Sequence, residues 1–157
     1  MTTDSLTGLN LDDMDRLAQR LVSAIAPGDV ILLIGDLGAG KTQFAKFLIN
    51  AASTIHTEVP SPTFTLVQTY DTAKGEIWHF DLYRIEDEAE IEATGWDEAL
   101  SHGISIVEWP DRLGRYLPKT RLEIHITIAD DDSRTVSLLP IGATWQNRAI
   151  PLTKEKL

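Results

Sequence analysis

The sequence predicts an α/β fold with a mainly parallel central sheet, antiparallel additions and flanking helices. The first observation is the apolar run VILLI at 30–34, which leads into GDLGAGKT at 35–42 and then into a segment with helical spacing. The second is ISIVEW at 104–109, a further strand of the kind that helices bury on both faces. The third is the alternating stretch 121–140, which is typical of an antiparallel hairpin.

The first helix is expected to begin after Asn10, a suitable N-cap that acidic residues follow in the first turn. Its apolar residues recur at the spacing of one helical stripe, namely Leu11, Met14, Leu17, Leu21 and Ile25. The segment 10–25 therefore predicts an amphipathic helix, which the turn APGD at 26–29 separates from the strand 30–34.

The middle of the chain predicts two strands and then short helices. Residues 61–84 indicate two strands joined by a turn at 72–75. The acidic segment 86–103 indicates one or two short helices interrupted at Gly95, before the strand 104–109. Pro110 suits the first turn of a helix, and the hairpin 121–140 is expected to turn at 130–133.

We expect one domain over residues 1–157, since the chain has the size of one ordinary domain and is 43% apolar. The last 13 residues, from Trp145, show neither period nor motif. We therefore expect a loosely docked tail within residues 140–157.

The composition excludes several classes of function. Because 24 acidic residues stand against 14 basic ones, the net charge of −10 argues against direct binding of DNA or RNA. The chain has no cysteine, which excludes disulfides, a thiolate nucleophile and cysteine zinc sites. The N-terminal stretch lacks the pattern of a signal peptide, and no apolar run approaches the roughly 20 residues that span a bilayer. We expect a cytoplasmic protein without a membrane contact.

The stretch GDLGAGKT has the pattern Gly-x-x-x-x-Gly-Lys-Thr between a strand and a helix. Gly35, Gly38 and Gly40 allow the tight backbone that turns successive N–H groups toward a phosphate. Lys41 is then placed to reach the β and γ phosphates, and the hydroxyl of Thr42 to ligate Mg²⁺. The loop therefore predicts nucleotide binding in a P-loop NTPase fold.

Two acids follow apolar strands and are candidates for phosphoryl-transfer chemistry, Asp81 and Glu108. The residues alone do not assign one to the metal and the other to water. His79 shares a strand face with Asp81 and is either a structural histidine or a base. In PSPTF, Pro60 and Pro62 hold Thr63 on a defined loop, which is either a connector or a sensor of the γ phosphate.

The nucleotide is predicted to be ATP, since no Asn-Lys-x-Asp motif is present to read guanine. We expect neither a ring-ATPase lid nor a second helicase lobe within these 157 residues. A stand-alone ATPase or a small kinase remains.

Four motifs, GDLGAGKT, SPTF, HFDLYR and VEWPDRL, resemble in order and spacing the TsaE family, the bacterial ATPases of tRNA threonylcarbamoyladenosine synthesis. The resemblance covers roughly residues 10–140. It implies a weak Mg²⁺-dependent ATPase that acts with the proteins TsaD and TsaB. That pair transfers the threonylcarbamoyl group to adenosine 37, so tRNA would be reached only through the complex.

The resemblance also implies roles for single residues. The catalytic residues would be Asp81, Lys41 and Glu108, with Asp81 as the catalytic or water-orienting acid. Thr42 and Glu108 would bind Mg²⁺, and Trp109 would help to place Glu108. Nucleotide contacts would come from Gly35, Asp36, Leu37, Gly38, Ala39, Gly40, Lys41 and Thr42, from Thr63 in the sensing loop, and from Arg134 beside the adenine, together with the stretch before Asn10.

Two other functions stay open. A small-metabolite kinase would use Asp81 as the base toward an acceptor hydroxyl, and would need an arginine-bearing lid. A nucleotide-dependent binding switch would change its affinity for a partner without useful hydrolysis.

Overall fold

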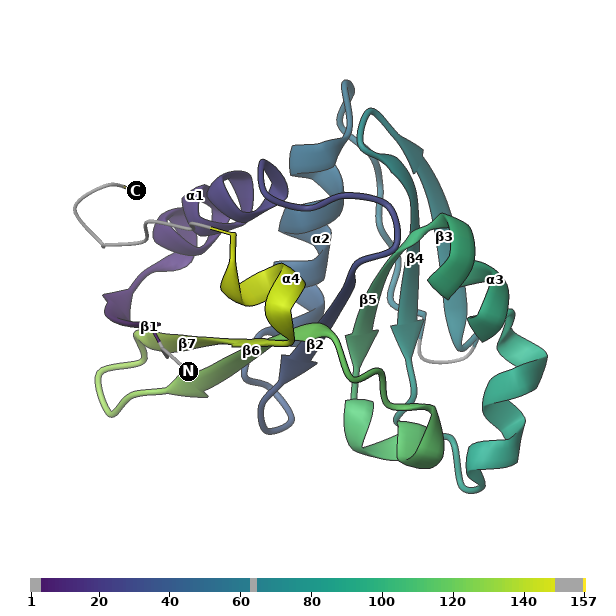
Figure 1. Ribbon diagram of the computed structural model, residues 1–157. Helices are drawn as coiled ribbons and strands as arrows, with labels where there is room; N and C mark the ends of the chain where they lie inside the picture. The colour runs from purple at the N-terminus through teal and green to yellow at the C-terminus, as the bar shows by residue number, and fades with distance from the viewer. Residues whose placement is uncertain (1–3, 63–64, 149–156) are drawn as a thin grey trace.

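The computed structural model describes residues 4–62, 65–148 and 157, which form a seven-stranded mixed sheet with helices on its faces (Figure 1). The strand order is β1-β7-β6-β2-β5-β4-β3. The strands are β1 (Asp4–Leu9), β2 (Val30–Ile34), β3 (Val67–Thr72), β4 (Gly75–Asp81), β5 (Ile104–Glu108), β6 (Arg121–Ile128) and β7 (Arg134–Ile141). The helices are α1 (Leu11–Val22), α2 (Lys41–Ala52), η1 (Glu88–Thr94), α3 (Trp96–His102), η2 (Pro110–Tyr116) and α4 (Ala143–Gln146), of which η1 and η2 are 3₁₀ helices.

The centre of the sheet is parallel and its margins are antiparallel, which confirms the predicted fold class. β2 runs parallel to both β5 and β6, and β4 runs parallel to β5. The antiparallel pairs are β3 with β4, β6 with β7, and β1 with β7. Because β2, β4 and β5 end at one edge, the residues that follow them are brought together there.

The predicted first helix is confirmed, but it ends at Val22, so Ile25 of the predicted stripe lies beyond it, and Leu11 is a second difference. The side chain of Asn10 accepts the N–H of Asp13 and the side chain of Asp13 accepts the N–H of Asn10, so the helix begins with a capping box. Leu11 was predicted to be in the core, but it is 64% exposed. It lies in the first turn of α1, where it borders a surface cavity instead of the sheet.

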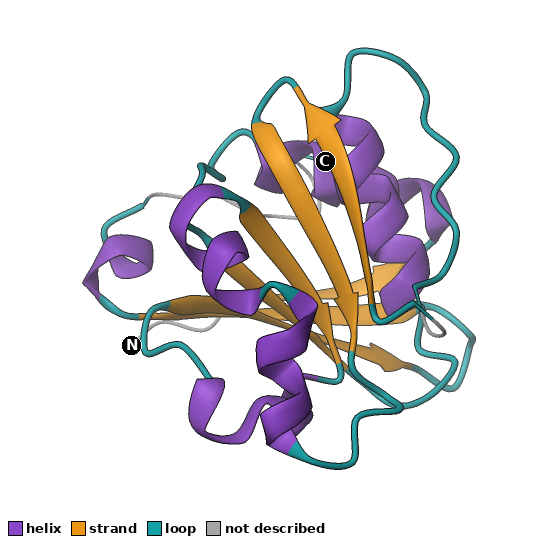
Figure 2. Cartoon of the chain, turned by 90° about the vertical axis from the view of Figure 1, so that its right-hand side faces the viewer, coloured by secondary structure: helices purple, strands orange, loops and turns teal. Residues whose placement is uncertain are grey.

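The two sheet faces are covered to different extents (Figure 2). On one face, α1 and α2 cover a core that extends from β4 and β5 across β2 to β6 and β7. On the other face, η1, α3 and η2 cover a smaller core over β2, β4 and β5. Gly95, at φ +88°, separates η1 from α3 and confirms the predicted interruption.

Strand β1 was missed because its apolar residues do not alternate. Leu6 and Leu9 are both buried although three positions separate them. The pairing of β1 with β7 is irregular between these two residues, and Gly8 has φ +66° there. Such a bulge shifts the alternation of buried and exposed residues by one position. A search for strict alternation therefore does not find the strand.

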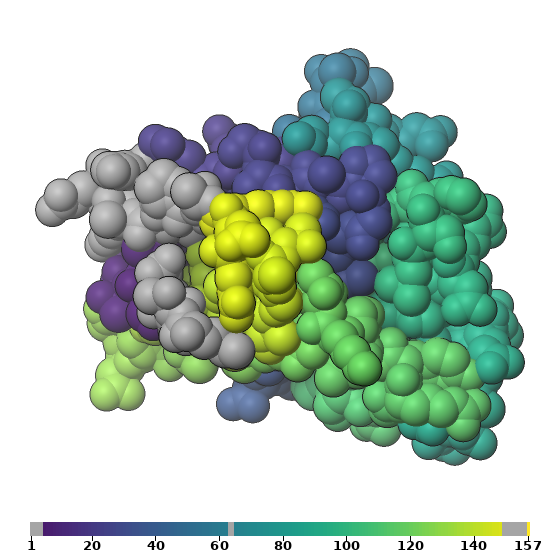
Figure 3. Space-filling model, viewed as in Figure 1, coloured from purple at the N-terminus to yellow at the C-terminus, as the bar shows by residue number. Residues whose placement is uncertain are grey.

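The described part of the expected tail is packed on the molecule. Pro140 and Ile141 belong to β7, and Trp145 on α4 is buried in the larger core. Arg148 donates hydrogen bonds to the carboxylate of Asp29 and to the carbonyl oxygen of Ala24. Figure 3 shows α4, in yellow, lying against the body of the molecule. These contacts attach the described part of the segment to the molecule, and residues 149–156 lie outside the described chain.

Candidate functional site

The glycine-rich loop joins β2 to α2 at the edge where the parallel strands end. Gly38 and Gly40 have φ of +85° and +104°, a backbone conformation that other residues adopt at a cost. A Cβ at Gly35 would lie 2.5 Å from the carbonyl oxygen of Ile126. Gly40, the N-cap of α2, supplies no capping side chain, and the first turn has no acid. No side chain caps the first N–H groups of α2 in the described part of the chain, and an anion would find donors there.

Lys41 is folded back onto the loop that precedes it. Its side chain is buried, and its ammonium donates hydrogen bonds to the carbonyl oxygens of Gly35 and, at 3.4 Å, Asp36. The ammonium also lies 3.6 Å from the ring centroid of Trp109. Burial lowers the pKa of Lys41, while the nearby carboxylates, Glu108 first, oppose that shift. A phosphate in the loop would compete with the two carbonyls for this ammonium.

The two candidate acids stand side by side at the ends of adjacent parallel strands. Asp81 on β4 is the register partner of Glu108 on β5, and both are buried. Glu108 Oε1 accepts a hydrogen bond of 2.6 Å from the Thr42 hydroxyl, and Oε2 lies 2.7 Å from Nε2 of His79. Asp81 Oδ1 accepts the N–H of Tyr83 at 3.1 Å. Glu108 is thus held between the loop helix and a fully buried histidine.

These groups line a cavity of about 360 Å³, which we call the P-loop cavity. Its lining residues are Leu37, Gly38, Gly40, Lys41, Thr42, Gln43, Asp81, Tyr83, Glu108 and Trp109. The donors that could hold a metal here are the Thr42 hydroxyl and the Glu108 carboxylate, both hard oxygen ligands. The described residues contain no cluster of three or more His, Asp or Glu able to hold a metal ion. This sparse set fits Mg²⁺, which usually keeps several waters and binds substrate phosphates.

A second cavity, of about 280 Å³, opens beside the loop and shares Gly40 and Gln43 with the first. Its other lining residues are Leu9, Asn10, Leu11, Met14, Ala39, Phe44, Phe47, Asp132 and Arg134. Arg134 is fixed by its hydrogen bonds to the carbonyl oxygens of Ala39, at 2.9 Å, and Asp132, at 2.7 Å. The structure thus brings Arg134 to the stretch before Asn10, although the two are far apart in sequence.

Other predicted residues have different outcomes. Asp36 and Leu37 lie on the loop and are exposed, and Ala39 is buried beneath it. Thr63 lies outside the described residues. Sequence reasoning missed two contacts, the one between Trp109 and Lys41 and the one between His79 and Glu108. The available signals were the position of Trp109 next to Glu108 and the face that His79 shares with Asp81.

None of the helices in the described part of the chain is long and apolar enough to cross a membrane.

Comparisons with known proteins agree with these observations. The model of the family "Threonylcarbamoyl adenosine biosynthesis protein TsaE" matches residues 9–136. The chain is 37% identical over 139 residues to the "tRNA threonylcarbamoyladenosine biosynthesis protein TsaE" of Bacillus subtilis, which covers 88% of this chain and 86% of that one. It is 36% identical over 130 residues to the Rickettsia felis protein of the same name, covering 83% and 76% of the two chains.

A solved structure also matches. The crystal structure of Bacillus subtilis YdiB has a TM-score of 0.76 and 30% identity, and the match covers 92% of this chain and 90% of that one. This score, over nine-tenths of each chain, indicates that the two folds are the same. The chain therefore belongs to the TsaE family, which takes part in the biosynthesis of threonylcarbamoyladenosine in tRNA.

Proposed function

We propose that the chain is a weak Mg²⁺-dependent ATPase that acts with TsaD and TsaB to support threonylcarbamoyladenosine formation at position 37 of tRNA. The observation that carries the ATPase proposal is the hydrogen bond between Thr42 and Glu108, which joins the loop helix to the end of β5. A glycine-rich turn that merely connects a strand to a helix has no need of this contact. The proposed role requires access to tRNA, so we propose the cytoplasm as its location.

ATP would occupy both cavities. The triphosphate would lie in the P-loop cavity against the first N–H groups of α2, and the adenine would lie in the second cavity near Arg134. Phe44 and Phe47 give the second cavity apolar surface that suits a purine ring. Gly40 and Gln43 line both cavities, so one molecule is able to extend from one to the other.

Four polar side chains of the P-loop cavity have tasks in this proposal. Lys41 would leave the loop carbonyls and neutralise charge on the β and γ phosphates. Thr42 and Glu108 would hold Mg²⁺, which supplies further charge neutralisation when bound. Asp81 would orient the attacking water, since its carboxylate stands beside Glu108 at the same strand edge.

Slow turnover is expected from this chain alone. Among the described residues that line the P-loop cavity, Lys41 is the one cation, and none is an arginine. In related phosphoryl-transfer enzymes an added arginine raises kcat by about 10³ to 10⁵. A partner that completes the site would therefore accelerate hydrolysis, in agreement with an ATPase activated by TsaD and TsaB.

The test is steady-state ATP hydrolysis by the purified chain with Mg²⁺, first alone and then with TsaD and TsaB. We expect slow turnover that rises sharply with the pair and disappears in EDTA. Tight nucleotide binding with negligible turnover even in the presence of the pair would instead identify a binding switch. Transfer of phosphate to a small molecule in a metabolite screen would identify a kinase.

A further inference from the structure

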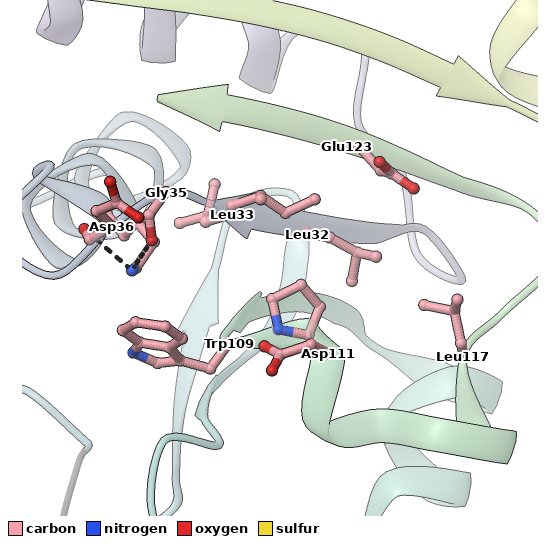
Figure 4. A pocket seen from close by; sticks show the side chains of 11 residues that line it. Leu32, Leu33, Gly35, Asp36, Trp109, Asp111, Leu117 and Glu123 are labelled. Carbon is pink, nitrogen blue, oxygen red and sulfur yellow. Dashed lines mark hydrogen bonds between the residues drawn. The ribbon is translucent and has the colours of Figure 1, made fainter. Parts of the chain in front are cut away.

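A third cavity, of about 450 Å³, lies between β2 and η2, and we call it the β2–η2 groove (Figure 4). Its apolar lining includes Leu32, Trp109 and Leu117, and the acidic residues Asp36, Asp111 and Glu123 also line it. Lys41 and Trp109 line both this groove and the P-loop cavity. The groove is therefore the neighbour of the proposed nucleotide site, with a shared wall.

The carboxylates of the groove differ in how far they are already neutralised. Glu123 bonds to Arg121 at 2.8 Å and to His125 at 3.0 Å. The side chain of Asp111 is 71% exposed, and its ion pair with Arg112 is long, at 3.8 Å. Asp36 is also exposed. Asp36 and Asp111 thus leave negative charge at the rim, on a chain whose net charge is already −10.

This combination is typical of a protein interface more than of a small-molecule site. A small-molecule site places a few polar groups inside an apolar pocket to orient its ligand. Here the incompletely neutralised carboxylates stand in water at the rim, and the apolar Leu117 is 40% exposed. An apolar centre with a charged rim is the usual anatomy of an interface.

We propose that the β2–η2 groove binds a segment of a partner protein that carries an apolar side chain next to a lysine or arginine. The apolar side chain would pack against Leu117 and Trp109, and the cation would face Asp36 and Asp111. This inference rests on the proposed function, which names the TsaD–TsaB pair as the partner.

Docking in the groove would act on the nucleotide site through Trp109. The indole ring covers the ammonium of Lys41 at 3.6 Å, and Trp109 itself is held at φ +57°, which is uncommon for a residue with a side chain. A segment seated in the groove contacts this ring and so changes the balance between the two positions of Lys41, on the loop carbonyls or on phosphate. Because coupling between two binding sites is reciprocal, ATP would then change the affinity for the partner by the same factor.

The experiment measures binding of the purified TsaD–TsaB pair to the full chain by isothermal titration calorimetry, without nucleotide and then with it. Leu117→Asp places a charge in the apolar centre, and Asp111→Lys reverses the charge of the rim. We expect each to weaken binding of the pair by about tenfold or more, the effect of losing an interface anchor. Asp111→Lys should also reduce the dependence of binding on NaCl concentration, because it removes an attraction between exposed charges.

Three controls separate the groove from the general properties of the surface. Leu117→Met keeps the apolar contact and should bind the pair like the wild-type chain. Ile55→Asp and Asp97→Lys make the same kinds of change at exposed positions elsewhere on the surface and should also bind normally. Affinity for a fluorescent ATP analogue in the absence of the pair should stay within about twofold in all five variants, which shows that each remains folded.

The outcomes distinguish the groove from the proposed function. Selective loss of binding in Leu117→Asp and Asp111→Lys supports the groove. Wild-type affinity in both variants would overturn it and leave the proposed function intact. If the wild-type chain does not bind the pair at all, the partner assignment fails, and the groove proposal fails with it.

Discussion

The P-loop cavity and the β2–η2 groove share Lys41 and Trp109 but are built in opposite ways. At the P-loop cavity the buried carboxylate of Glu108 bonds to the half-buried Thr42 and to the buried His79. In the groove the centre is apolar, and exposed carboxylates stand at the rim. Preorganised buried charges suit a ligand with a defined charge distribution, such as a nucleotide. An apolar centre suits the surface of a partner protein that binds and dissociates. Substitutions should therefore separate the two functions.

Lys41→Ala should have the largest effect on ATP binding, because it removes the ammonium proposed to contact the phosphates. Since Lys41 lines both cavities, the substitution also tests which of the two the lysine serves. A charge-assisted hydrogen bond contributes about 1.5–3 kcal/mol, so losing the ammonium should weaken ATP binding by about 10- to 150-fold. Titration with a fluorescent ATP analogue measures this loss. Circular dichroism should remain close to wild type and the Tm should not fall below it, since the substitution removes a buried charge and no packing within the apolar cores. Unchanged affinity would reject the assignment of the loop to phosphate.

Glu108→Gln and Asp81→Asn should divide the two acids by role within the P-loop cavity. Glu108 contacts Thr42, so Glu108→Gln should raise the Mg²⁺ concentration needed for half-maximal ATP binding by about tenfold. Asp81→Asn should mainly lower kcat and leave that concentration nearly unchanged. Both substitutions conserve size, so neither opens a void. A Mg²⁺ titration with the reverse pattern would exchange the two roles.

His79→Leu tests whether the buried histidine positions Glu108 or simply fills space. His79 is fully buried, and its Nε2 lies 2.7 Å from Glu108 Oε2, so it restrains the carboxylate that faces Thr42. We expect His79→Leu to raise the Mg²⁺ requirement for ATP binding by up to about tenfold, the lower range for a residue that supports a metal ligand. His79→Gln keeps a donor and should restore most of the loss. Equal Mg²⁺ requirements in the two variants, with equal loss of thermal stability, would indicate a packing role alone.

The sequence predicted those features that depend on local spacing. The strand, glycine-rich loop and helix at 30–52 are contiguous, so their pattern was sufficient for the loop and for the expectation of nucleotide binding. The positions of Asp81 and Glu108 at strand ends also followed, because parallel neighbours end at one edge. The resemblance to the TsaE family added roles that spacing alone left open.

The features that were missed depend on contacts between distant segments. The bulge at Gly8 concealed β1, and the burial of Trp145 depends on a core formed by residues from both ends of the chain. The contact between His79 and Glu108 depends on the register of β4 and β5, and the strand face that His79 shares with Asp81 does not by itself give this register. The β2–η2 groove combines residues from β2, β6 and the segment 109–117, so it exists only in the folded chain.

The smallest expected effect is that of Lys41→Met on the stability of the chain without nucleotide. This substitution should weaken ATP binding but raise the stability of the fold. Burial lowers the pKa of Lys41 below its ordinary value of 10.5, so the folded chain without nucleotide holds the ammonium less favourably than water does. Removing the charge should therefore stabilise this form by about 1 kcal/mol, the usual size of one substitution's effect, or about 2–4 °C in Tm.

The sign of the pH dependence gives the check on that stabilisation. A lysine with a lowered folded pKa destabilises the fold fully below that pKa, and the penalty disappears as the pH rises from the folded pKa toward 10.5. The Tm difference between Lys41→Met and wild type should thus be positive near neutral pH and shrink as the pH is raised toward 10.5. A constant difference would place its origin in packing. A lysine that lowers the stability of the free chain and binds phosphate in the complex would show that the P-loop cavity is arranged for its ligand. Leu117→Met in the groove should change neither the Tm nor the affinity for ATP.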